Sequence, residues 1–233
     1  MFLVSRAVRL VIAGCLVVAL GACTSDDADP QPDETGPPIS VDKMRAALLP
    51  PEIVGRTWSA SDDPPSVTAV AALCAGGVAR VPAPGSPTMA VAAAVDEGDK
   101  GAQTFDQAAL VYSDAASAKS AVAALRSAAG ACPTTVNKPA ATGADNAEAA
   151  YTETVTVSPL ATEAWSGFSA IRHKQYEPKT PGSADAAVLV LRRRNVVLVA
   201  GYAIYWVGVH TTGPEFTADW RRLVGTVLDR VEA

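Results

Sequence analysis

Histidine, cysteine and short catalytic motifs are scarce in this sequence of 233 residues, which has two histidines and four cysteines. It contains no H-E-x-x-H, G-x-x-x-x-G-K-[S/T], G-x-G-x-x-G or calcium-loop pattern, each of which places metal or phosphate ligands at fixed spacing. The G-x-S-x-G turn of serine hydrolases and the C-x-x-C dithiol are also missing. His173 and His210 have no local signature, and we expect His173, within a polar run, to be solvated. We therefore expect a protein that is not an enzyme and that uses no cofactor and no metal.

The sequence also lacks an excess of positive charge. It has 19 lysines and arginines against 24 acidic residues, which gives a formal net charge of −5 at pH 7. Proteins that bind nucleic acid or anionic lipid through their surface are usually basic. We therefore expect no nucleic-acid partner.

The apolar run near the amino terminus is short. It extends from Leu10 to Leu20 and follows two positive charges, Arg6 and Arg9. This is about half the length that a helix needs to cross a hydrocarbon core of roughly 30 Å, and it ends in small residues instead of a charged flank. The pattern predicts a cleaved signal peptide over residues 1–22.

The residues at the end of this run resemble a bacterial lipobox. Leu20 is followed by Gly21, Ala22 and Cys23, and small residues are needed there for entry into the peptidase site. The resemblance implies cleavage before Cys23 and a diacylglyceryl group on its sulfur. We expect attachment to the outer face of the cell membrane, because two or more acyl chains anchor a protein stably.

Residues 23–40 have the composition of a tether. They contain five acidic residues and four prolines, with no aliphatic or aromatic residue before Ile39. Such a segment cannot bury enough apolar surface to offset the entropy lost on ordering. We expect an extended, disordered linker between the lipid and a single domain that spans residues 41–233.

The order of helical and extended patterns predicts an α+β domain with an antiparallel sheet and flanking helices. Asp114 and Gly130 bracket one helix as its amino-terminal cap and its end. Pro214 begins another, with apolar residues on one stripe. The runs 186–191 and 196–206 predict a central hairpin, because both are apolar at consecutive positions. The remaining expected elements are helices at 41–49 and 66–74 and extended segments at 88–95, 104–112, 149–157 and 164–174.

The mature domain keeps one pair of cysteines, Cys74 and Cys132, because Cys15 leaves with the signal peptide and Cys23 is lipidated. An even pair in an exported domain predicts a disulfide. In the chain-entropy model, closing the loop between these two cysteines contributes on the order of 4 kcal/mol to the free energy of unfolding.

Two sets of residues are candidate ligand contacts. The first is the basic cluster Arg192, Arg193 and Arg194. Such a cluster is suited to phosphate or carboxylate, but we expect it to form a solvated hairpin tip. The second is aromatic, with Trp165 and Tyr205 as the members nearest to polar or loop residues; such rings occur both in cores and in ligand clefts.

Several segments together resemble the PknH-like extracellular sensor domain of actinobacterial, mycobacterial-type lipoproteins. They are the opening LLPPEIVG, Trp58, the phrase FDQAALVYSDAASAKSAVAALRSAAGACP, the late pair of strands, and the helix that contains Trp220. The resemblance implies an antiparallel sheet covered by helices, a disulfide at a helix exit, and a cleft for an unidentified small ligand. This chain has no kinase, and it keeps one cysteine pair where the sensor domain has two.

Three functions remain open from the sequence. The first is an extracytoplasmic, sensor-like module that binds a small envelope molecule and signals to, or presents it to, a membrane partner. The second is a lipid or glycolipid carrier, which needs an apolar cavity of more than about 1,000 Å³. The third is an envelope hydrolase. The carrier cavity is expected to be lined by Val188, Val190, Val197 and Val199.

Overall fold

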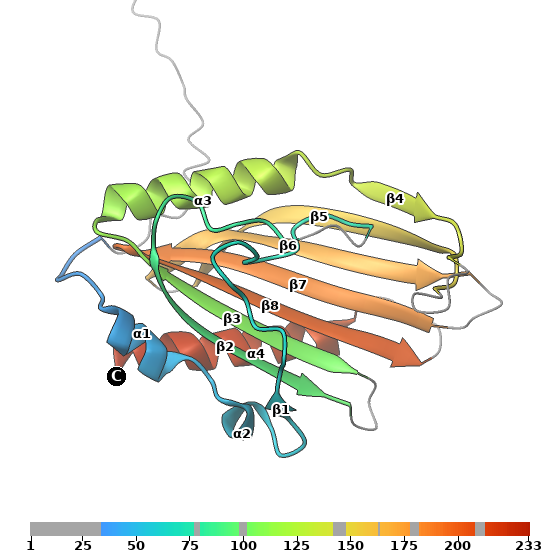
Figure 1. The fold of residues 1–233 in the computed structure, drawn as a ribbon, viewed down its shortest axis with the longest axis horizontal. Coiled ribbons are helices and arrows are strands. Elements are labelled where there is room, and N and C mark those ends of the chain that lie inside the picture. Colours follow the sequence, from blue (N-terminus) through green and yellow to red (C-terminus); the bar gives the residue numbers. More distant parts are fainter. Residues whose placement is uncertain are drawn as a thin grey trace, which may run out of the picture.

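A single antiparallel sheet organises the protein (Figure 1). The computed structural model describes residues 34–76, 80–97, 102–141, 148–162, 164–177, 182–207 and 213–233. The expected signal peptide, Cys23 and His210 lie outside these ranges. The sheet has eight strands in the order β1-β2-β3-β8-β7-β6-β5-β4, and every pairing is antiparallel. The strands are β1 (Ser59–Ala60), β2 (Thr88–Asp96), β3 (Gln103–Val111), β4 (Thr135–Lys138), β5 (Tyr151–Thr162), β6 (Trp165–Tyr176), β7 (Gly182–Arg193) and β8 (Val196–Val207).

Helices lie on both faces of this sheet, which confirms the predicted α+β class. The helices α1 (Val41–Ala47), α2 (Pro51–Val54) and α4 (Pro214–Glu232) cover one face. The other face is covered by α3 (Ala115–Gly130) together with the segment between β1 and β2. We call that segment, residues 61–76 and 80–87, the strap; it crosses the front of the sheet in Figure 1.

The two helices that the sequence predicted from their end residues are confirmed. The Asp114 side chain accepts a hydrogen bond of 2.7 Å from the Ser117 backbone N–H and so caps α3, which ends at Gly130. Helix α4 begins at Pro214. Its buried stripe fixes it to the sheet, since a surface helix gains most of its stability from one apolar face. The stripe comprises Phe216, Trp220, Leu223, Val224, Val227, Leu228 and Val231.

The β7–β8 hairpin lies in the middle of the sheet, as predicted. Its two strands pair over their length and are almost continuously buried up to Ile204, because both faces are covered. In the turn between them, Arg194 adopts the left-handed backbone, with φ of 49°. Asn195 is buried, and its side chain bonds the backbone of Ile39 and Tyr112.

The helix expected over residues 66–74 does not form. Residues 66–69 form a turn closed by an isolated bridge between Ser66 and Ala69, and a second bridge joins Ala71 to Val81. Alanine favours helix intrinsically, but tertiary packing overrides this weak preference. Here Val70 and Leu73 pack against the sheet instead. The short edge strands β1 and β4 also escaped the sequence analysis.

The last part of the expected tether contacts the domain. Ile39 is buried, and its N–H donates a 2.8 Å hydrogen bond to the Asn195 side chain. The Arg194 side chain donates to the Pro37 carbonyl oxygen, and Arg192 pairs with Glu34. Residues 34–40 therefore lie against the β7–β8 turn.

Candidate ligand cleft

A disulfide holds the strap in place. Cys74, in the strap, and Cys132, just beyond the end of α3, are bonded, and their Cα atoms lie 5.2 Å apart. The predicted pairing is therefore present in the structure. Both the strap and α3 pack on the same face of the sheet, so the bond fixes the spacing between the two elements that cover it.

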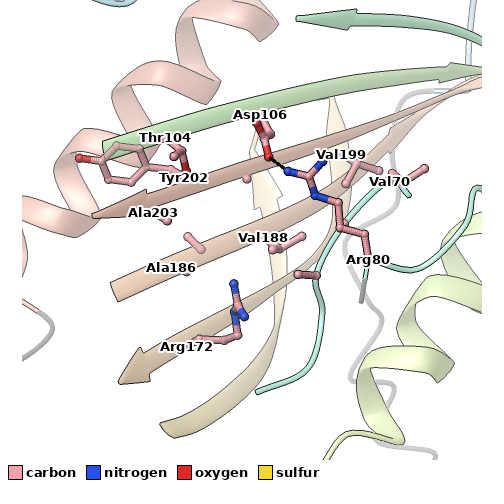
Figure 2. A pocket seen from close by; sticks show the side chains of 14 residues that line it. Val70, Arg80, Thr104, Asp106, Arg172, Ala186, Val188, Val199, Tyr202 and Ala203 are labelled. Atoms are coloured by element: carbon pink, nitrogen blue, oxygen red, sulfur yellow. Dashed lines mark hydrogen bonds and ion pairs between the residues drawn. The ribbon is translucent and has the colours of Figure 1, made fainter. Parts of the chain in front are cut away.

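A cavity of about 180 Å³ opens between the strap and the sheet (Figure 2). Small side chains form its floor, because Gly201 and Ala203 of β8 lie next to Ala186 of β7. Val70, Ala71 and Ala72 belong to the strap side of the cavity. The polar groups stand around this apolar floor, which is the usual composition of a small-molecule site.

An ion pair marks one side of the cleft. Arg80, from the strap, donates from Nη2 to Asp106 Oδ2 of β3 at 2.9 Å (Figure 2). Its Nη1 donates to the Asp63 carbonyl oxygen at 3.2 Å. Burial raises the pKa of Asp106, and the positive charge of Arg80 opposes that shift. The pair thus ties the strap to the sheet.

Arg172 of β6 stands on the other side of the floor strands (Figure 2). Its Nη1 donates to the Cys74 carbonyl oxygen at 3.2 Å and lies 3.6 Å from Glu153 Oε1. Glu153 is buried and also accepts a 2.7 Å hydrogen bond from the Gly76 N–H. Burial lowers the pKa of the Arg172 guanidinium, while the Glu153 carboxylate acts in the opposite direction.

The Nε of Arg172 is buried and has no hydrogen-bond partner among the described residues. Such a donor costs free energy unless a ligand or a water satisfies it. A mostly buried cation with an unused donor at the edge of a cavity is suited to a carboxylate or phosphate group, since guanidinium binds these through paired N–H groups.

An aromatic row continues this face beyond Arg172. The rings of Tyr176 and Tyr205 meet edge to face at 6.0 Å, and those of Tyr151 and Tyr176 at 5.7 Å. Lys174 Nζ lies 4.0 Å from the centre of the Tyr151 ring. Tyr205, a predicted ligand contact, is 36% exposed and stands two residues beyond Ala203 of the floor.

Comparison with solved structures finds a protein of similar fold. The domain is similar in fold to the extracellular domain of PknH from Mycobacterium tuberculosis. The TM-score is 0.52, and the match covers 85% of this chain and 99% of that one. The two sequences are 16% identical, so this likeness concerns the fold alone. No family model and no curated protein matches the sequence.

The basic cluster of the hairpin is not a solvated tip and does not reach the cleft. Arg192 and Arg193 are each 7% exposed. They form ion pairs with Glu34 and Glu232, respectively. The expectation of free, exposed cations was wrong because the amino-terminal segment and the end of α4 both pack over this turn.

The other aromatic candidate, Trp165, was also placed wrongly. It is 1% exposed and belongs to the core on the α4 face of the sheet, opposite the cleft. The next residue, Ser166, is polar, but β6 alternates its side chains between the two faces, and the Trp165 ring points into the core.

His173 is not simply solvated. Its Nδ1 lies 2.7 Å from Asp185 Oδ1, and Trp206 Nε1 donates to Asp185 Oδ2 at 2.9 Å. Asp185 is fully buried. In the part of the chain that the structure describes, no three histidine, cysteine or acidic side chains gather as metal ligands. Among the same residues, no helix is long and apolar enough to span a membrane.

The sequence analysis missed the residues that surround the cleft. Arg80, Asp106 and Arg172 are far apart in the chain and match no motif. Strand alternation predicts only the face on which Asp106 and Arg172 lie. Which strand neighbours which, and where the strap crosses, are properties of the whole fold.

Proposed function

We propose that this chain is a lipid-anchored, extracytoplasmic binding protein whose cleft receives a small anionic molecule. The observation that carries this proposal is Arg172, a mostly buried cation beside a cavity of about 180 Å³. Its Nε has no hydrogen-bond partner in the part of the chain that the structure describes. The similarity in fold to an extracellular domain supports the compartment. Attachment through Cys23 follows from the lipobox-like residues before it.

The size of the cleft favours a binding module over a lipid carrier. A carrier needs more than about 1,000 Å³ of apolar space. Of the four valines expected to line such a cavity, Val188 and Val199 line the cleft of about 180 Å³ instead. Val190 and Val197 are fully buried in the core that the sheet shares with α3.

A non-catalytic role fits the lining of the cleft. The described residues around the cavity include no serine, cysteine or histidine; Thr104 and Asp106 line it, and the Asp106 carboxylate is paired with Arg80. A hydrolase needs a nucleophile or an activated water beside a base. We propose that the domain holds its ligand without changing it and passes any response to a membrane partner.

The experiment is mass spectrometry of the protein purified gently from its native envelope, compared with three variants. We expect a small anionic molecule to copurify with the wild type and with Arg45→Gln, an exposed arginine on α1. Arg172→Gln should lose it. Ala203→Leu, which fills the floor while leaving the cation in place, should lose it as well. Equal occupancy in all four proteins would overturn the assignment of the cleft.

The lipid anchor has its own test. Cys23→Ala should leave the precursor unprocessed or release the protein from membranes, because the thioether cannot form. Membrane fractionation with mass measurement of the amino-terminal peptide distinguishes these outcomes. Normal cleavage with unchanged membrane retention would exclude acylation at this position.

A further inference from the structure

A second cavity lies on the opposite face of the sheet, between α4 and strands β5 and β7. Its volume is about 240 Å³. Most of its wall is aliphatic: Leu189 and Leu191 come from β7, and Val224 and Leu228 from α4. An apolar cavity of about 150 Å³ holds a molecule the size of benzene. This one has room for a short hydrocarbon chain and not for a whole lipid.

Gly225 keeps this cavity open. It lies in the middle of α4 and lines the cavity, and a Cβ added there would meet no atom within 4 Å. Glycine inside a helix costs about 1 kcal/mol relative to alanine. No close packing contact at this position requires glycine, and what its missing side chain provides is space.

Trp220 supplies an unused polar group in the same wall. The residue is 6% exposed, and its indole Nε1 is buried and meets no hydrogen-bond partner within the described ranges. A buried donor in this state costs about 1–3 kcal/mol, and buried indole N–H groups usually find an acceptor. An oxygen atom of a bound molecule would satisfy it.

Arg221 adds positive charge at the exposed side of the cavity. It lines the cavity, is exposed to solvent, and its guanidinium lies 5.2 Å from the centre of the Trp220 ring. The wall therefore combines aliphatic side chains, a neutral donor without a partner, and a cation beside it. That combination matches a hydrocarbon chain that ends in a carboxylate or an ester.

We propose that the cavity under α4 binds one acyl chain, with its carboxylate or ester oxygen accepting from Trp220 Nε1 beside Arg221. This site is separate from the cleft under the strap. Its assignment does not depend on the ligand of that cleft.

Octanoate and methyl octanoate are the probes, titrated into the purified mature chain by calorimetry or by NMR of the indole N–H signals. We expect micromolar to low-millimolar binding of at least one probe, with a shift of the Trp220 indole signal. If both bind, the site accepts free and esterified chains. Binding of octanoate alone would indicate a free fatty acid, and binding of the ester alone an acyl chain of a larger lipid. Binding of neither at millimolar concentration would overturn the proposal.

Gly225→Leu should abolish binding by filling the cavity, and it should fold because leucine is a better helix former than glycine. Gly130→Leu is the matched control, since a Cβ at Gly130 also meets nothing within 4 Å but lies at the end of α3. This control should bind like the wild type. Unchanged affinity in Gly225→Leu would show that the probe binds elsewhere and would contradict the proposal.

Two further variants separate the polar contacts. Trp220→Phe keeps an aromatic ring but removes the donor, and it should weaken both probes about tenfold. Arg221→Gln should weaken octanoate and leave methyl octanoate unchanged. Equal affinity of Trp220→Phe and the wild type for both probes would exclude the indole as the contact.

Discussion

Arg80 Nη2 lies 2.9 Å from Asp106 Oδ2, and this ion pair joins the strap to the third strand of the sheet. Both side chains are about one quarter exposed. The pair stands at the cleft, so the protonation of Asp106 bears both on the stability of the fold and on the charge that a ligand meets.

The ionisation of Asp106 should contribute to the pH dependence of the free energy of unfolding. Burial raises its folded pKa above its ordinary value of 3.8, although Arg80 opposes the shift. The folded state then holds this proton more tightly than the unfolded state does. The contribution of protonated Asp106 to the stability of the fold is full below the ordinary pKa and is lost as pH rises through the raised pKa.

Asp106→Asn has no carboxyl group to ionise, so the variant does not lose this contribution. As the pH rises from about 3.5 to about 6.5, the difference in free energy of unfolding should therefore shift in favour of the variant over the wild type. Urea unfolding at the two pH values measures it, with Asp62→Asn, an exposed strap residue, as the control. The same difference at both pH values would show that Asp106 has an ordinary pKa.

Val199→Asp tests the burial of the central hairpin. Val199 is 3% exposed, in β8 beneath the strap, so an aspartate there would be a buried charge without a designed partner. We expect the free energy of unfolding to fall by about 3 kcal/mol or more. Val91→Asp, at a position of β2 that is 40% exposed, should cost less than about 1 kcal/mol. Similar losses in the two variants would contradict the observed topology.

Arg193→Gln tests the turn that was expected to be a solvated tip. The arginine side chain is 9% exposed and pairs with Glu232 at the end of α4. Removing the cation leaves polar groups at a mostly buried contact without their partner, so we expect a loss of about 1–3 kcal/mol. Arg45→Gln, whose side chain is 58% exposed, should change stability by less than about 1 kcal/mol. Thermal and urea melts that show no loss in Arg193→Gln would place this guanidinium in solvent.

The disulfide should matter most for the strap. We expect the double variant Cys74→Ala and Cys132→Ala to lose about 2–4 kcal/mol, because the loop of 58 residues is no longer closed in the unfolded chain. Hydrogen exchange should rise first in the strap, while α4, on the other face, serves as the internal reference. Equal increases in both elements would mean that the bond stabilises the domain globally without ordering the strap.

Local signals in the sequence determined much of the fold. Asp114 and Gly130 mark the ends of α3, because capping depends on residues within one turn of the helix end. The two apolar runs around the Arg194–Asn195 turn predicted a buried hairpin, because strands that are apolar at consecutive positions need cover on both faces. The cysteine pair followed from counting, since two cysteines in the domain allow only one bridge.

Only the tertiary structure decided where the chemistry lies. By sequence alone, the three arginines of the hairpin fit a free cationic tip. In the structure, Glu34 and Glu232, from the two ends of the described chain, form ion pairs with two of them. Arg80, Asp106 and Arg172 became neighbours because the strap crosses strands that lie 26 to 92 residues further along the chain. The burial of a side chain and the pairing of its charge depend on contacts between residues far apart in the chain, and the local preferences of a sequence do not predict such contacts.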